Sequence, residues 1–312
     1  MTVHFHSVRV AALFAAMLFG GVTANAQEKF KSPDDAVAAL VAAARSDNSR
    51  GLMKVLGEPG RDILFSGDDV ADQKRRADFL VAFDLKHQIV KKGDSAADLV
   101  LGPNDWQLPI PLVQKAGVWQ FDTAAGRREV LARRIGGNEL SAIQTALSYV
   151  DAQNEYASMN PQGTKVDSYA QRIISTPGKK DGLYWPAAAN EPQSPLGEAF
   201  ALAAIQGYRP GAEAAPYHGY YYKVLTGQGA NVPGGAMNYL VKGNLIGGFG
   251  LVAYPAEYGN SGVMTFIVNH SGVVMQKDLG PNTARIASRM TAFDPDSTWR
   301  KVPDADLKLA PK

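Results

Sequence analysis

Serine and histidine side chains suited to nucleophilic catalysis occur in this chain, but the sequence does not bring them together. Gly259-Asn260-Ser261-Gly262 places a serine among small residues, and a nucleophilic serine needs a base within hydrogen-bond reach. The next histidine along the chain, His270, lies about 30 Å away if the residues between them form an extended strand. We therefore interpret Ser261 as part of a turn, and we predict no catalytic residue.

Metal-ligating side chains are equally sparse. Beyond the first 26 residues the histidines are His87, His218 and His270, and none has a His, Asp or Glu partner at metal-ligand spacing. The chain has no cysteine, so it offers no thiolate ligand and no disulfide. The segment 160–164 lacks the alternating carboxylates that Ca²⁺ requires. The sequence thus predicts no metal site and no cofactor.

Aromatic side chains form the two candidate binding surfaces. Tyr184 and Trp185 stand in a Pro- and Gly-rich loop, where an exposed pair would contact a ligand and a buried pair would pin the loop. Around His218, alternate tyrosines of an extended strand would share one face, which could stack on a sugar or a peptide or pack as core. In both clusters packing is the favoured interpretation. The candidate binding residues are Tyr184, Trp185, Tyr217, His218, Tyr220 and Tyr222.

Carboxylates provide the alternative, enzymatic interpretation. Hydrolysis of glycosides requires two carboxyl groups about 5–10 Å apart, a spacing that only the fold can set. Asp151, Glu155 and Asp181 are candidates because they lie near the aromatic loop in the sequence. If a cleft gathers these carboxylates near His218, an envelope hydrolase is favoured. If they are scattered in solvent, a binding or structural protein is favoured.

The first 26 residues have the three parts of a cleavable signal peptide. A short segment ends at Arg9, an apolar stretch covers residues 10–19, and Ala24-Asn25-Ala26 supplies the small residues that signal peptidase requires. The apolar stretch is about ten residues long, half of what a membrane-spanning helix needs. We predict cleavage after Ala26 and a periplasmic or secreted product with no membrane span.

The charge balance argues against nucleic acid as a partner. The formal net charge of +2 falls by one when Arg9 is removed with the signal peptide, and no block of Lys and Arg occurs. Phosphate binding depends on clustered positive charge. We therefore expect an envelope protein or a glycan as partner.

The N-terminal part, residues 27–136, has the pattern of an α+β domain. Ser32-Pro33-Asp34-Asp35 predicts a helix start, and further helices are expected at 50–56 and 74–84. The hydrophobic period then approaches two, which predicts strands at 87–90, 97–101, 108–113 and 118–121. In element order and in its closing Val118-Trp119-Gln120-Phe121 strand this segment resembles cystatin-like and nuclear-transport-factor-like domains.

The C-terminal part, residues 137–303, is predicted to be a second α+β domain. Gly136-Gly137-Asn138 is expected to break one helix and start another, which carries the buried stripe Leu140, Ile143, Leu147 and Val150. A loop region with one helix at 196–206 follows. Strands are expected at 219–226, 249–254, 263–269 and 273–277, then a short helix at 286–290 and a frayed tail at 304–312.

Two resemblances follow from this order and from specific segments. A long helix followed by a four-stranded antiparallel meander, carried by segments 138–143, 219–224 and 261–268 with 272–274, resembles the globular heads of type IV pilins and pseudopilins. A whole domain replaces their exposed assembly helix, so filament assembly is not implied. From residue 32 to about 303 the chain resembles the bacterial DUF2950 family. The segments that carry this resemblance are 121–126, 149–153, 175–186, 216–221 and 276–280.

The DUF2950 name denotes unknown function, so the resemblance supplies no active site. We expect an exported, non-enzymatic binding or structural protein of the bacterial envelope. The alternatives are a hydrolase with carboxylates in a cleft between the domains, and an accessory subunit of a secretion or pilus-like apparatus.

Overall fold

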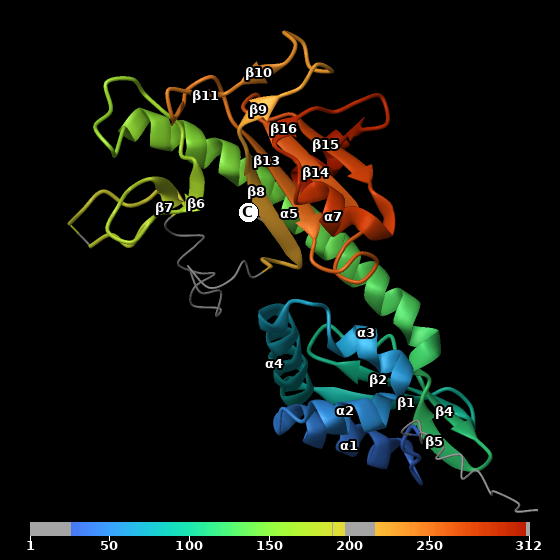
Figure 1. The fold of residues 1–312 in the computed structure, drawn as a ribbon. Coiled ribbons are helices and arrows are strands. Elements are labelled where there is room, and N and C mark those ends of the chain that lie inside the picture. The colour runs from blue at the N-terminus through green and yellow to red at the C-terminus, as the bar shows by residue number, and fades with distance from the viewer. Residues whose placement is uncertain (1–25, 189, 197–215, 310–312) are drawn as a thin grey trace, which may run out of the picture.

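The computed structural model describes residues 26–188, 190–196 and 216–309 (Figure 1). Residues 1–25 of the predicted signal peptide and residues 197–206 of the predicted helix 196–206 lie outside the described residues. The fold is mixed α+β, as the sequence predicts.

The N-terminal helices begin where capping side chains stand. Ser32 accepts a hydrogen bond from the Asp35 backbone N–H at 3.1 Å, which confirms the predicted helix start. Asp68 caps the last of these helices in the same way, through the Ala71 N–H at 3.0 Å. Two short helical turns lie between the second and the last of these helices. The elements are α1 (Pro33–Arg45), α2 (Ser49–Leu56), η1 (Glu58–Gly60), α3 (Arg61–Leu64) and α4 (Asp69–Leu85).

An antiparallel sheet follows, with the order β1-β2-β4-β5 and β3 paired to β2. Its strands are β1 (His87–Lys91), β2 (Ala96–Leu101), β3 (Trp106–Gln107), β4 (Leu112–Lys115) and β5 (Val118–Phe121). The β4–β5 turn has positive φ at both central residues, Ala116 and Gly117, which is the two-residue hairpin geometry that the closing strand predicted. The core between helices and sheet includes Val37, Leu40, Leu52, Leu99, Leu112 and Phe121.

One helix, α5 (Thr123–Met159), connects the two halves of the molecule (Figure 1). It has 37 residues and so extends about 55 Å. The break predicted at Gly136-Gly137 is wrong, because both glycines lie inside this helix without positive φ. Each glycine costs a helix only about 1 kcal/mol relative to alanine. The packing of α5 on α3, η1 and β14 outweighs that cost.

The C-terminal sheet has the antiparallel order β17-β15-β14-β13-β8. Four of its strands lie within one or two residues of their predicted positions: β8 (Tyr220–Leu225), β13 (Gly250–Pro255), β14 (Met264–Asn269) and β15 (Val274–Asp278), with β17 (Arg300–Lys301) added at the edge. Alternate residues face two cores. Leu251 and Phe266 pack toward α5, whereas Val252 and Ile267 pack toward Trp299 and the short helix α7 (Thr283–Ala287).

The remaining elements are short and lie in the long connections. They are β6 (Arg172–Ile174), β7 (Gly182–Tyr184), β9 (Gly227–Gln228), β10 (Met237–Asn238), β11 (Leu240–Val241), β12 (Asn244–Leu245), η2 (Gly280–Asn282), β16 (Ala292–Phe293) and α8 (Asp304–Leu309). The final predicted helix begins three residues earlier than expected, as α7. The tail expected to fray from Asp304 forms α8 instead, and Gln144 of α5 donates a hydrogen bond to the Leu307 carbonyl at 3.1 Å.

Candidate functional site

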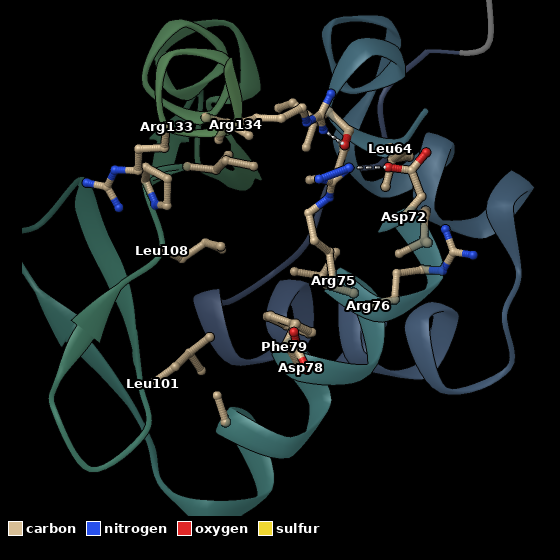
Figure 2. Close-up of a pocket in the computed structure, with 18 of the residues that line it drawn as sticks. Leu64, Asp72, Arg75, Arg76, Asp78, Phe79, Leu101, Leu108, Arg133 and Arg134 are labelled. Carbon is tan, nitrogen blue, oxygen red and sulfur yellow. Dashed lines mark hydrogen bonds and ion pairs between the residues drawn. The ribbon is translucent and has the colours of Figure 1, made fainter. Parts of the chain in front are cut away.

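An apolar pocket of about 510 Å³ lies in the N-terminal half of the molecule, bounded by α4, α5 and the sheet (Figure 2). This volume is within the range of small-molecule binding sites, roughly 300–1,000 Å³. Its walls are mostly aliphatic and aromatic side chains. The apolar lining residues are Leu40, Leu52, Leu56, Ile63, Leu64, Phe79, Ala82, Leu101, Trp106, Leu108, Pro109, Ile110 and Val130.

Helix α4 forms one wall of the pocket, and its apolar side is only partly buried. Phe79, Leu80 and Phe83 form the apolar stripe that the sequence shows, yet each is only partly buried. In the whole of α4, which the structure describes completely, Asp72 is the only buried residue. Phe79 and Ala82 pack against the N-terminal core and also line the pocket. The helix therefore presents apolar surface to a space that a ligand could fill.

Three of the charged lining residues, Asp72, Arg75 and Arg134, lie at one end of the pocket (Figure 2). Arg75 of α4 donates hydrogen bonds to Asp72 and to the Ser66 hydroxyl, both at 2.9 Å. Asp72, which is buried, also accepts from the Ser66 N–H and hydroxyl at 2.8 Å each. Figure 2 shows the Arg75 and Arg134 side chains meeting at this end, whereas Arg133 points away. Asp72 and Arg75 thus form an ion pair whose polar atoms are occupied within the protein.

Arg134 reaches the same end from α5 and is 7% exposed. Its Nη1 donates to the Asp62 carbonyl at 2.5 Å and to Asn260 Oδ1 at 2.6 Å, and its Nη2 donates to the Ile63 carbonyl. Its buried Nε has no hydrogen-bond partner among the described residues. Burial and the neighbouring positive charge of Arg75 lower the pKa of Arg134 to about 10. The guanidinium is therefore a buried cation held by neutral oxygens.

The same end of the pocket adjoins the C-terminal sheet. Asn260, in the turn before β14, accepts from Arg134 and donates to the Phe65 carbonyl and to Glu257, each at 2.8 Å. Asp68, the cap of α4, also accepts from the Gly219 N–H at 2.9 Å. Polar contacts thus join this end of the pocket to Gly219, directly before β8, and to the turn between β13 and β14.

The two candidate aromatic surfaces differ in how far they are buried. Trp185 is 4% exposed and packs edge-on against Tyr156, with ring centroids 6.3 Å apart, while Lys180 lies over its ring. Tyr220 is fully buried and donates to the Met264 carbonyl at 2.9 Å. Neither ring offers a free face, as the packing interpretation expects. Tyr184 is only partly buried.

The other three aromatic candidates, Tyr217, His218 and Tyr222, lie together and are partly buried. The Tyr217 ring is 4.2 Å from that of His218 and 6.5 Å from that of Tyr222, measured between centroids. Burial raises the pKa of Tyr217 and of Tyr222. Burial also lowers the pKa of His218, with Asp68 acting in the opposite direction. This cluster therefore belongs to the contact between the α4 cap and β8.

The serine and the carboxylates considered in the sequence are exposed or engaged by neighbouring groups. The hydroxyl of Ser261 is engaged by the Glu257 backbone, at 2.9 Å to its N–H and 3.2 Å to its carbonyl, as the turn interpretation requires. Asp151 and Glu155 are exposed on α5, and Asp181 binds Thr176 at 2.7 and 2.8 Å. In the part of the chain that the structure describes, no three His, Asp or Glu side chains group as a metal site would need.

Fold and pocket define a mixed α+β protein in which an apolar pocket lies between helices and an antiparallel sheet. A family model described as "Protein of unknown function (DUF2950)" matches residues 27–302, and the chain belongs to this family. The match confirms the family resemblance seen in the sequence. No curated protein and no solved structure matches the chain. Within the described residues, no helix is both long and apolar enough to cross a membrane.

The pocket was missed in the sequence because its lining comes from segments more than 90 residues apart, between Leu40 and Arg134. One feature of the sequence pointed to the pocket. Arg75 and Arg76 lie within one helical turn of Phe79, so charged residues stand beside residues expected to be core.

Proposed function

We propose that this protein is a non-enzymatic binding protein of the bacterial envelope that holds an apolar small molecule in the pocket beneath α4. The observation that carries the proposal is the pocket itself, about 510 Å³ in volume and lined mainly by carbon. The envelope location rests on the signal peptide predicted at residues 1–26. A soluble carrier with an apolar interior would suit an aqueous compartment in which apolar molecules need transport or sensing.

The energetics favour an occupant. Removing apolar surface from water contributes about 25 cal/mol per Å². A ligand that covers Phe79 and Leu108, on opposite walls, would remove from water the apolar surface of these side chains and its own apolar surface. A purely structural module would gain more by collapsing α4 onto the sheet.

The two halves have different parts in this proposal. We assign ligand binding to residues 27–136 and treat 137–303 as a second domain that docks a partner, in keeping with its separate hydrophobic cores. The order of α5 and the meander β8-β13-β14-β15 is what supports the likeness to pilin heads. Asp151 and Glu155 are exposed on α5 and do not line the pocket, and Asp181 is held by Thr176, so these carboxylates give the hydrolase alternative no support.

The test is a titration of the mature protein with phenylnaphthylamine, a neutral probe that fluoresces in apolar surroundings. We expect saturable binding to the wild type and its loss in Ala82→Phe, which fills the pocket from α4. Ala77→Phe is the matched control, because Ala77 is exposed on the same helix and does not line the pocket. Equal binding by both variants, with both folded by circular dichroism, would exclude the pocket as the site.

A further inference from the structure

We propose that the pocket takes an amphiphile with one anionic head group, a carboxylate on an apolar chain, and that Arg134 binds this head. The inference rests on the proposed function and specifies its ligand. The apolar walls would hold the chain. The head would lie at the end where Arg75 and Arg134 meet (Figure 2).

The first argument is the unpartnered donor. A guanidinium has five N–H groups, and those of Arg134 meet three oxygens, of Asp62, Ile63 and Asn260. Nε is buried without a partner, and Nη2 has two N–H groups but one acceptor. Nε and Nη2 form one edge of the planar guanidinium. That edge matches the two oxygens of a carboxylate in the side-on, bidentate arrangement.

The second argument is the missing counter-charge. Buried charges in proteins are paired or bind ions, because an unpaired buried charge costs several kcal/mol. Among the described residues, no carboxylate oxygen lies within 4.0 Å of Arg134; the thirteen ion pairs found there leave it out. Asp72 pairs with Arg75 and Asp62 pairs with Arg127, while Glu257 accepts a hydrogen bond from Asn260 and acts on Arg134 only from a distance. Arg134 therefore has no carboxylate in direct contact, and a ligand carboxylate would supply one.

The third argument is that charge and apolar surface are arranged at different places in the pocket. Leu101 and Leu108 line the sheet side, away from Arg75 and Arg134 (Figure 2). A small inorganic anion would satisfy Arg134 and leave these walls empty. A neutral hydrocarbon would fill the walls and leave Nε unpaired. A carboxylate on an apolar chain satisfies both.

The test compares dodecanoate with dodecanol, which share a chain and differ in the head, as competitors of bound phenylnaphthylamine. We expect wild-type protein to bind dodecanoate about tenfold or more tightly than dodecanol, since charge-assisted hydrogen bonds contribute about 1.5–3 kcal/mol. In Arg134→Gln this preference should vanish while dodecanol binding persists. Arg128→Gln is the matched control, because Arg128 is exposed on α5 and does not line the pocket.

A second measurement uses wild-type protein and so does not depend on the variant folding. In a nitrogen-labelled sample, the Nε–H resonance of Arg134 should shift with dodecanoate and not with dodecanol. If both compounds bind equally, or if the preference survives in Arg134→Gln, the head-group inference is overturned and the proposed function stands. If neither compound displaces the probe and the probe itself does not bind, the proposed function fails as well.

Discussion

Arg134 of α5 donates a hydrogen bond to the side chain of Asn260 at 2.6 Å, across 126 residues of sequence. The first residue lines the apolar pocket, and the second stands in the turn that enters β14 of the C-terminal sheet. This buried hydrogen bond therefore joins the proposed ligand site to the part of the molecule for which we propose partner binding.

Replacing Asn260 should weaken the whole protein. Asn260→Ala removes the acceptor of Arg134 and the donor to the Phe65 carbonyl, both in nearly buried surroundings. Leaving buried polar groups unpaired costs about 1–3 kcal/mol each, and more for a charged group. We expect the free energy of unfolding in urea to fall by about 2–4 kcal/mol. Asn282→Ala is the control, because Asn282 is exposed and its side chain makes no cap hydrogen bond; equal effects of the two changes would contradict the assignment.

Two glycines of α5 should respond to alanine in opposite ways. At Gly126 a Cβ would lie 2.3 Å from the Pro109 carbonyl oxygen, which belongs to the backbone of the pocket wall. Gly126→Ala should therefore cost at least about 2 kcal/mol through overpacking. At Gly136 a Cβ meets nothing within 4 Å, so Gly136→Ala should stabilise the helix by about 0.5–1 kcal/mol. Thermal unfolding of both variants gives the measurement. A loss at Gly136 as large as that at Gly126 would show that α5 is not continuous there.

His218 should make stability depend on pH near neutrality. Its burial lowers the pKa below the ordinary value of 6.5, so the unfolded chain takes up a proton at higher pH than the folded protein does. The free energy of unfolding should then fall as the pH decreases through about 6.5, and this contribution is complete below the folded pKa. His218→Asn should flatten the decrease between about pH 7.5 and 5, and asparagine tolerates the φ of 49° at this position. A variant that loses as much stability as the wild type over this range would refute the prediction.

The aromatic loop should prove to be an anchor of the fold. Trp185 is 4% exposed against Tyr156, so Trp185→Ala should lower the free energy of unfolding by about 3–5 kcal/mol. Trp185→Phe keeps the ring packing and loses only an indole N–H that has no partner among the described residues, so about 1.5 kcal/mol or less should be lost. Denaturant titrations distinguish the two. If Trp185→Ala were neutral, the loop would be free to act as a binding surface.

Strand positions were the most predictable part of the fold. In β13 and β14, successive apolar residues such as Leu251 and Val252 face opposite cores, and this period of two is written into the sequence itself. The residue types at turns also indicated how neighbouring strands pair, as at the Ala116-Gly117 turn between β4 and β5. The continuous α5 was not predictable in the same way. Gly136-Gly137 favours a break locally, and only the contacts along the helix outweigh that preference.

The sequence by itself determined the family, the α+β class, the absence of cysteine and the positions of the longer strands, because these depend on residue identity and on neighbours in the chain. The tertiary structure alone decided that Trp185 packs inside, that a pocket remains beneath α4, and that the Nε of Arg134 lies buried without a partner among the described residues. The reason is physical. A pocket is the space that separate segments leave between them, and a charge is unpaired only in relation to groups near it in space, whatever their distance along the chain.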